Sequence, residues 1–431
     1  MKELLVLQGP VSSRSGYGDH TRDILKSLIE MDRFDIKVVD MRWGSCPRNG
    51  IEEKDENLKK LFLTQNLHVQ PDVFIQVSVP NEFQRKGKYN IGITAGIETT
   101  AVAPQWIEGM NRMDMNIVPS EHSKQAFIKS VYDAVDKRTN QVTSQLKYEK
   151  PIEVLFEGAD TNVFNNKPKS FKTVDDELNL IKEKFCFLYV GHWLEGSHGH
   201  DRKDVGKLIE TFITTFKSNP SSTRPALILK TSSATFSVVD REHMKKKIRD
   251  VLSRMKVKNP PKIYLLHGNL TSDELNYLYN HPKVKAHVSF TKGEGFGRPL
   301  LEASLSGKPV IASNWSGQVD FLKYSVKLPG KVQQVHESAV WKDVILKESG
   351  WFYVNYGYAS KVLKDVFKNY KTYLPNAKKQ ARLSREEFSL SAMNVKMKEI
   401  MDKYLVEKVE LKLPNQKQQL PKLPKLKRVE A

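Results

Sequence analysis

Short apolar runs alternate with longer amphipathic segments along most of the chain. The first run, Leu4–Leu7, is followed by a turn rich in glycine and serine over 8–20 and by a helical pattern over 21–30. Runs typical of buried strands lie at 4–7, 36–39, 72–77, 89–94, 116–118, 185–190, 227–229, 263–266, 286–290 and 309–312. Strands that alternate with helices predict an α/β fold with doubly wound parallel sheets, in which ligands bind at the carboxyl ends of strands.

The strand-like runs form two series, and the polar stretch 165–177 between them is the predicted linker. A chain of 431 residues is too long for one compact core. We therefore expect two Rossmann-like domains, 1–165 and 166–358, that face each other across a cleft. A helical region is expected at 359–408. The basic tail 409–431 repeats Leu-Pro-Lys, which predicts an extended segment without fixed structure that binds a polyanion or a partner groove, or is inert.

Composition narrows the class of protein. Hydrophobic residues make up 39% of the chain, and no apolar run approaches the roughly 20 residues that a membrane span requires. The N-terminus lacks the apolar region and cleavage site of a signal peptide. The two cysteines, Cys46 and Cys186, lack metal-ligand spacing, so reduced thiols in a cytoplasmic protein are expected.

The formal net charge of +19 is the second informative property of the composition. Because 406–431 holds seven Lys/Arg and three Glu, most of the excess lies in the body of the chain, with basic clusters at 245–262 and 124–150. Such a surplus favours polyanionic partners, namely nucleic acid, an anionic membrane or acidic glycans. A basic surface that serves only solubility is the alternative interpretation.

The segment 290–313 holds the most specific motif. Three glycines at 293, 295 and 297 precede a short helical pattern, and two glutamates, Glu294 and Glu302, lie eight positions apart. Glycines permit close approach of the backbone to a ligand, and a helix that starts near Arg298 would direct free N–H groups toward a phosphate. A charged, solvated helix start is the alternative interpretation.

This segment resembles the donor motif, glutamate and seven residues and glutamate, of retaining glycosyltransferases with the GT-B fold. The resemblance implies that Glu294 contacts the donor sugar, that Glu302 binds the nucleotide ribose, and that the backbone of Gly295, Phe296 and Gly297 lies against the sugar and diphosphate. It further implies that 1–165 is the acceptor domain, that 166–358 is the donor domain, and that 359–408 crosses back to the first domain.

Other segments carry the same resemblance. Gly16, Tyr17 and Gly18 are similar to the loop near the donor diphosphate, and the segments 96–122 and 157–164 fit the family pattern. The stretch 190–212 is similar to the phosphate-binding segment, which implies that Lys203, Arg202 and, more weakly, Lys230 contact the diphosphate. His192 replaces the arginine of the family. The resemblance assigns the catalytic site to Glu294, Glu98, Arg202 and Lys203, with His20 and His122 as acceptor or sugar contacts.

The chemistry of the leaving group fits these residues. The nucleoside diphosphate develops charge that must be stabilised by cations, hydrogen-bond donors or a helix dipole. Since there is no Asp-x-Asp triplet, we expect no metal and no other cofactor, and we interpret His198 and His200 as part of a polar loop. The chain also lacks a phosphate loop of the ATPase type and a Gly-x-Ser-x-Gly elbow, which disfavours an ATPase and a serine hydrolase.

The acceptor is addressed by a second resemblance. The stretches 191–195, 201–206 and 314–321 are similar to glycosyltransferases encoded by tailed phages, some of which add sugars to hydroxymethylcytosine in their DNA. The resemblance and the basic body predict a DNA acceptor, and a place of action in the cytoplasm of an infected host cell. Two alternatives are a transferase for a cell-surface glycan, lipid or protein, and a non-catalytic module that binds polyanions on a GT-B scaffold.

Overall fold

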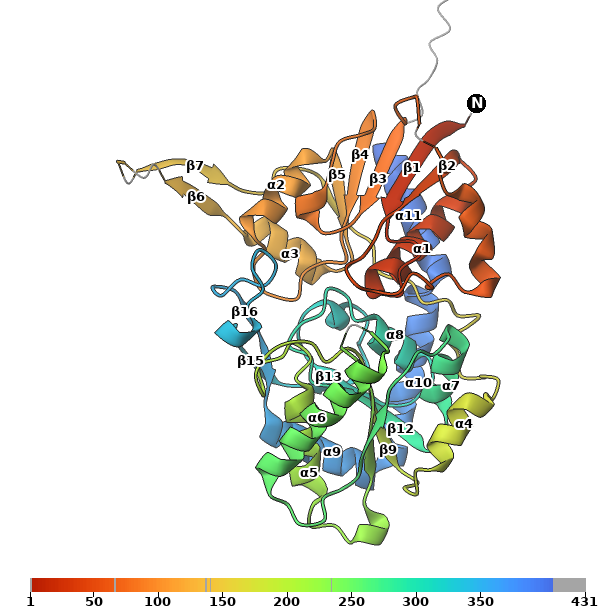
Figure 1. Cartoon of the computed structure of the whole chain (residues 1–431), viewed down its shortest axis with the longest axis vertical. Helices are drawn as coiled ribbons and strands as arrows, with labels where there is room; N and C mark the ends of the chain where they lie inside the picture. The colour runs from red at the N-terminus through yellow and green to blue at the C-terminus, as the bar shows by residue number, and fades with distance from the viewer. Residues whose placement is uncertain (1, 66, 136–137, 140, 234, 406–431) are drawn as a thin grey trace, which may run out of the picture.

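A computed structural model describes residues 2–65, 67–135, 138–139, 141–233 and 235–405 of the chain. The predicted tail 409–431 and the last residues of the predicted helical region, 406–408, lie outside the described residues. Within the described part, two bodies of α/β structure lie one above the other, and helices close to the C-terminus run along both of them (Figure 1).

The first sheet has six strands in the order β2-β1-β3-β4-β5-β8, and every neighbouring pair is parallel. Its strands are β1 (Glu3–Gly9), β2 (Phe34–Asp40), β3 (Val73–Val77), β4 (Tyr89–Ile93), β5 (Met115–Val118) and β8 (Ile152–Val154). Helices α1 (Gly16–Glu30), α2 (Pro104–Arg112) and α3 (Glu121–Lys129) belong to this part. The antiparallel strands β6 (Tyr132–Val135) and β7 (Val142–Leu146) form a separate hairpin that projects from the body (Figure 1).

The second sheet is also six-stranded and parallel, in the order β11-β10-β9-β12-β13-β14. Its strands are β9 (Cys186–Val190), β10 (Ala226–Lys230), β11 (Ile263–Leu266), β12 (Val284–Ser289), β13 (Val310–Ser313) and β14 (Val326–Leu328). The helices around it are α4 (Lys172–Asn179), α5 (Val205–Phe216), α6 (Val238–Met255), α7 (Ser272–Asn280) and α8 (Arg298–Ser304). A hairpin of β15 (Gly330–Gln334) and β16 (Gly350–Val354) follows, and the chain continues into α9 (Tyr356–Lys368), α10 (Tyr370–Glu387) and α11 (Leu390–Tyr404).

The predicted strands and the doubly wound parallel architecture are confirmed. Helices cover both faces of a parallel sheet, so its strands are nearly continuous apolar runs. In β3, for example, each residue is buried. The domain limits 1–165 and 166–358 stay predictions. Among the described residues, no helix is long and apolar enough to cross a bilayer.

Two local predictions are wrong. The predicted turn over 8–20 ends earlier, because α1 begins at Gly16, with Ser15 as its N-cap accepting a hydrogen bond from the Gly18 amide. The second half of the predicted linker 165–177 belongs to α4. Val174 and Leu178, four residues apart, bury one side of that helix, and this short apolar stripe is too weak a signal among polar neighbours.

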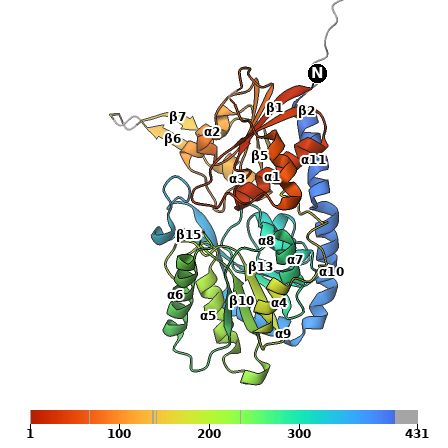
Figure 2. The ribbon, with the colours of Figure 1, turned by 45° about the vertical axis from the view of Figure 1, so that its right-hand side comes forward.

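The C-terminal helices connect the two bodies. Helix α11 lies beside α1, and its side chains Met393, Met397, Ile400 and Met401 belong to the same apolar cluster as β1 and β3 (Figure 2). Helix α10 lies beside the second sheet, where Gln380 donates a hydrogen bond to the carbonyl of Phe321. The chain therefore ties the second body to the first through a helix that completes the first core.

The β15–β16 hairpin forms another connection, on the opposite side from α10 and α11 (Figure 1). Thr100 of the first body exchanges two hydrogen bonds with Gly350, at 2.9 and 2.8 Å. Val344 and Leu346, in the loop between the two strands, pack against the apolar cluster of α2 and α3. Connections on two sides restrict how far the two bodies can separate.

The crossing helix gives a stability prediction. Met397 is fully buried in the first core, so Met397→Ala should lower the free energy of unfolding by about 2–5 kcal/mol. Val395 on the same helix is 60% exposed, and Val395→Ala should change it by less than about 0.5 kcal/mol. Urea denaturation followed by circular dichroism measures both. Equal losses in the two variants would contradict the placement of α11.

Candidate active site

The glycine-rich loop after β12 lies directly against the loop after β4 of the other sheet. A Cβ added to Gly293 would lie 1.8 Å from the carbonyl oxygen of Glu98, and one added to Gly295 would lie 2.0 Å from that of Ala95. Ser120 donates a hydrogen bond to the carbonyl of Gly295 at 2.5 Å. Positions 293 and 295 therefore need glycine because two backbones meet there.

Four charged residues of the predicted catalytic site meet at this junction. The ammonium of Lys203 donates a hydrogen bond to the carboxylate of Glu294. The guanidinium of Arg202 lies 3.3 Å from an oxygen of Glu294 and 3.3 Å from an oxygen of Glu98, so it joins the two bodies. Burial opposes ionisation of Glu294, but Lys203 and Arg202 outweigh this effect and hold the pKa of the carboxyl below its ordinary value. We call these four residues the junction cluster.

A further buried cation, Lys292, fixes the loop that carries the two cations of the junction cluster. Its ammonium is fully buried and donates hydrogen bonds to the carbonyls of Gly199 at 3.0 Å and Asp201 at 2.7 Å. It also pairs with Asp204 at 2.8 Å, a residue in the left-handed backbone region at the start of α5. Lys292 is not among the site residues predicted from the sequence, although a lysine directly before a glycine loop and after a buried strand is a recognisable signal.

Glu302 lies within α8, buried beside Arg298. The Nε of Arg298 donates a hydrogen bond to Glu302 at 2.9 Å, and the same guanidinium pairs with Asp23 on α1 of the other body. Burial raises the pKa of Glu302 to about 7; Arg298 opposes the rise, and Asp19 and Asp23 add to it. From the sequence, Arg298 was predicted only as the start of a helix, and this contact between the bodies was not predicted.

His192 lies near the cations of the junction cluster, and Lys230 ends β10, where its ammonium donates a hydrogen bond to the carbonyl of Gly268 at 2.7 Å. Burial lowers the pKa of Lys230 to about 8, and the charge of Arg14 on the other body contributes. Residue His192 is exposed, but desolvation by the surrounding protein lowers the pKa of its imidazole, and the charges of Lys203, Arg202 and Lys230 lower it further. Three cations therefore act on one histidine, which marks a region of positive potential that an anion can occupy.

The predicted donor-binding backbone lies in two places. Gly16, Tyr17 and Gly18 form the first turn of α1, where the hydroxyl of Tyr17 lies 2.9 Å from that of Thr94 at the end of β4. In the second body, Gly297 precedes α8 with a φ of 104°, a conformation that favours glycine.

Phe296 contributes only its backbone to this region. Its ring is 2% exposed and packs against Phe321 with centroids 4.9 Å apart, so the side chain belongs to the core of the second body.

The two histidines predicted to contact an acceptor differ in their surroundings. His20 is 1% exposed, and burial and then the charge of Arg298 lower its pKa to about 3, so this arrangement leaves the ring no open face. His122 packs edge-on against Trp315 with centroids 4.6 Å apart. Burial lowers the pKa of His122 to about 4, and its Nε2 has no hydrogen-bond partner among the described residues.

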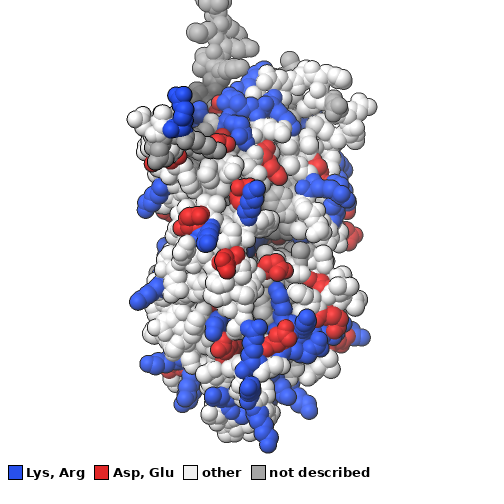
Figure 3. All heavy atoms as spheres, turned by 60° about the vertical axis from the view of Figure 1, so that its left-hand side comes forward, with Lys and Arg blue, Asp and Glu red and all other residues white. Residues whose placement is uncertain are grey.

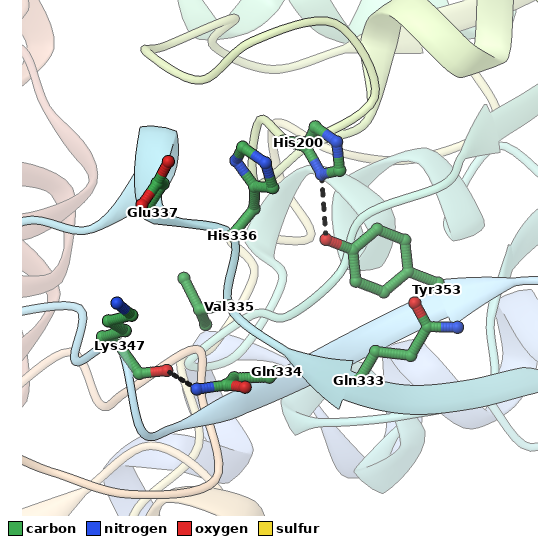
Figure 4. Close-up of a pocket in the computed structure, with 8 residues that line it drawn as sticks. All are labelled: His200, Gln333, Gln334, Val335, His336, Glu337, Lys347 and Tyr353. Atoms are coloured by element: carbon green, nitrogen blue, oxygen red, sulfur yellow. Dashed lines mark hydrogen bonds between the residues drawn. The ribbon is translucent and has the colours of Figure 1, made fainter.

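The histidines of the predicted polar loop also have protein partners. His198 lies 3.1 Å from Glu210, and His200 stacks on His336 with centroids 3.8 Å apart and lies 3.4 Å from the hydroxyl of Tyr353 (Figure 4). His200, but not His198, borders a pocket of about 390 Å³, lined by His200, Gln333, Gln334, Val335, His336, Glu337, Lys347 and Tyr353. No predicted site residue lines this pocket. Among the residues described, no group of three or more His, Cys, Asp or Glu side chains could hold a metal ion.

One segment of the chain, which carries part of this site, is similar to a known family. Residues 209–335 match the family model described as Glycosyl transferases group 1. The matched range contains Lys230, Glu294 and Glu302, whereas Glu98, Arg202 and Lys203 lie before it. The sequence has no significant match among curated proteins.

Several solved structures are similar over nearly the whole chain. Sucrose-phosphate synthase from Thermosynechococcus elongatus has a TM-score of 0.60 at 12% identity, covering 94% of this chain and 99% of that one. Anabaena HepE, in complex with UDP and glucose, has a TM-score of 0.56 at 12% identity, covering 93% and 100%. These neighbours confirm the predicted GT-B fold. The family match and the fold together indicate that this protein is a glycosyltransferase.

Proposed function

We propose that the protein is a retaining glycosyltransferase that moves a sugar from a nucleoside diphosphate to an acceptor hydroxyl. The observation that carries the proposal is the junction cluster, where Arg202 and Lys203 meet Glu294 and Glu98 between the two bodies. Carboxylates accept hydrogen bonds from sugar hydroxyls, and adjacent cations stabilise a departing diphosphate. The UDP held by Anabaena HepE supports a uridine-linked donor.

The cations of the site suit the leaving group. Lys203 and Arg202, together with Lys230, would stabilise the charge that develops on the β-phosphate oxygen as the glycosidic bond breaks. Because Glu294 already pairs with Lys203 and Arg202, the free site holds these side chains in place before the donor arrives. In this proposal the protein cations stabilise the leaving group, and the reaction needs no metal or other cofactor.

The reaction itself is a front-side displacement with retention at the anomeric carbon. The bond from C1 to the phosphate oxygen breaks, the bond from the acceptor oxygen to C1 forms on the same face, and the acceptor proton passes to the departing phosphate oxygen. No protein nucleophile is required. Glu294 orients the sugar, Glu302 accepts hydrogen bonds from the ribose, and Glu98 contacts the sugar or acceptor from the other body.

For the acceptor we propose hydroxymethylcytosine in DNA, modified in the cytoplasm of a phage-infected cell. The support is the resemblance to phage-encoded transferases and the net charge of +19. Lys and Arg side chains are spread over both bodies in Figure 3, with Asp and Glu among them, and the face is hollowed between the bodies. A duplex presents the hydroxymethyl group in the major groove, where the enzyme reaches it directly or after flipping the base.

Incubation of the protein with hydroxymethylated DNA and a panel of sugar nucleotides tests the proposal. A mass increase of one sugar on the modified base is expected, with none on unmodified cytosine, because the latter lacks the acceptor hydroxyl. Mass spectrometry of the released nucleosides gives the readout. If no donor gives a product on DNA but the donor is hydrolysed, the acceptor is a different one; if no donor is even hydrolysed, the non-catalytic alternative holds.

Substitutions of the two glutamates of the motif should affect different steps. Glu302→Ala should weaken binding of the nucleoside diphosphate roughly 10- to 100-fold, since it removes charge-assisted hydrogen bonds to the ribose. Glu294→Ala should lower the transfer rate by about 10²–10³-fold with a smaller effect on nucleotide binding. Calorimetry with UDP and steady-state kinetics separate the two effects. Wild-type activity in both variants would contradict the assignment of Glu294 and Glu302 to the donor site.

Lys230 should make nucleotide binding depend on pH. Since burial lowers its pKa to about 8, the ammonium is charged below that pH and loses its proton as the pH rises through it. UDP affinity should therefore fall between about pH 8 and pH 9.5 in the wild type. Lys230→Met should bind UDP more weakly than the wild type at pH 7, and its affinity should not show this decrease with pH. The control Lys246→Met, at an exposed lysine, should match the wild type. Calorimetry at three pH values provides the measurement. An identical pH profile in Lys230→Met would place Lys230 outside the phosphate site.

A further inference from the structure

The loop after β2 holds an aromatic side chain at the edge of the candidate active site. The ring of Trp43 packs on the ring of Tyr17 with centroids 4.2 Å apart and an angle of 32° between the planes. Tyr17 lies in the first turn of α1, and its hydroxyl reaches Thr94, at the carboxyl end of β4. Glu98 is close enough to act on the ionisation of Tyr17. One ring therefore separates Trp43 from the loop that carries Glu98.

The backbone around Trp43 is fixed before any ligand binds. The Met41 amide donates a hydrogen bond to the Gly9 carbonyl at 2.9 Å, and the Gly50 amide donates to the Ser12 carbonyl at 2.9 Å, which anchors both ends of the loop. Inside the loop, the Cys46 amide donates to the Trp43 carbonyl at 3.0 Å. A side chain held in this way binds a ligand with little loss of conformational entropy.

The surroundings of this ring pair are open and positively charged. Arg42 is exposed and forms no salt bridge within the described part of the chain, whereas the neighbouring Arg48 pairs with Asp40 at 2.6 Å. A Cβ added to Gly16 or to Gly44 would meet no atom within 4 Å, so the backbone on both sides leaves free space. An aromatic face beside an unpaired cation suits a planar ring that carries an anionic group.

We propose that Trp43, backed by Tyr17, is the platform on which a base of the acceptor nucleic acid stacks, with Arg42 contacting the adjoining phosphate. Proteins that bind single strands combine stacking on aromatic side chains with cations along the backbone. A base extruded from a duplex presents the same flat face. The inference rests on the proposed DNA acceptor, and it adds the residues that select a nucleotide rather than a sugar.

The test is binding of a fluorescent single-stranded oligonucleotide that contains hydroxymethylcytosine, without donor. Trp43→Ala should raise the dissociation constant about 5- to 150-fold, since it removes one stacking contact, whereas Trp43→Phe should keep most of the affinity. Trp341→Ala is the matched control, because Trp341 is 63% exposed on the β15–β16 loop. UDP affinity should be equal in all four proteins, which verifies that each is folded.

Three outcomes would overturn the platform. Trp43→Ala could bind the oligonucleotide like the wild type, Trp341→Ala could lose as much affinity, or Trp43→Ala could lose binding of a neutral oligosaccharide while keeping that of DNA. The proposed function is tested separately by sugar transfer. Transfer to DNA by the wild type with an unchanged KM for DNA in Trp43→Ala refutes only the platform. Oligonucleotide binding that depends on Trp43, without transfer to DNA, refutes only the acceptor.

Discussion

The need to pair buried charges at the junction of the two bodies governs the rest of this structure. Glu294 and Lys203 are 7% and 9% exposed, and such charges are unfavourable unless oppositely charged groups and hydrogen bonds surround them. Arg202 also reaches Glu98 of the other body, where the two backbones touch, and this close approach explains glycine at 293 and 295. It also requires the loop before α5 to be held in place, and the buried ammonium of Lys292 holds it.

The same arrangement prepares the site for its proposed chemistry. Removing charges from water strengthens each interaction among them, so a diphosphate that enters beside Lys203 and Arg202 meets cations that are already oriented. At the nucleotide end of the site, Arg298 is likewise held by two carboxylates, because it links Glu302 to Asp23 of the other body. The positions of the two bodies and the charge state of the donor site are therefore coupled through the same side chains.

The sequence predicted the elements of the fold better than the contacts between them. The predicted strands of both series are present, because strands of a parallel sheet are apolar throughout, and the glutamates of 290–313 stood out by their spacing. The edge strands β8 and β14, of three residues each, were not predicted, because each interrupts its apolar residues with a charged one. Helix α4 was missed because Val174 and Leu178 are few among polar residues. The role of Arg298 was missed as well, since a single charged residue carries no periodic pattern and this one pairs with Asp23, far away in the chain.

The sequence by itself determined the α/β class, the two series of strands and the residues that carry the donor motif. Periodicity and local spacing encode these properties within a few neighbouring positions. Only the tertiary structure decided that Arg202 joins Glu98 to Glu294, that α11 completes the first core and that His20 is enclosed. These outcomes depend on side chains separated by up to several hundred residues, and the packing of the two bodies alone brings such side chains within reach of one another.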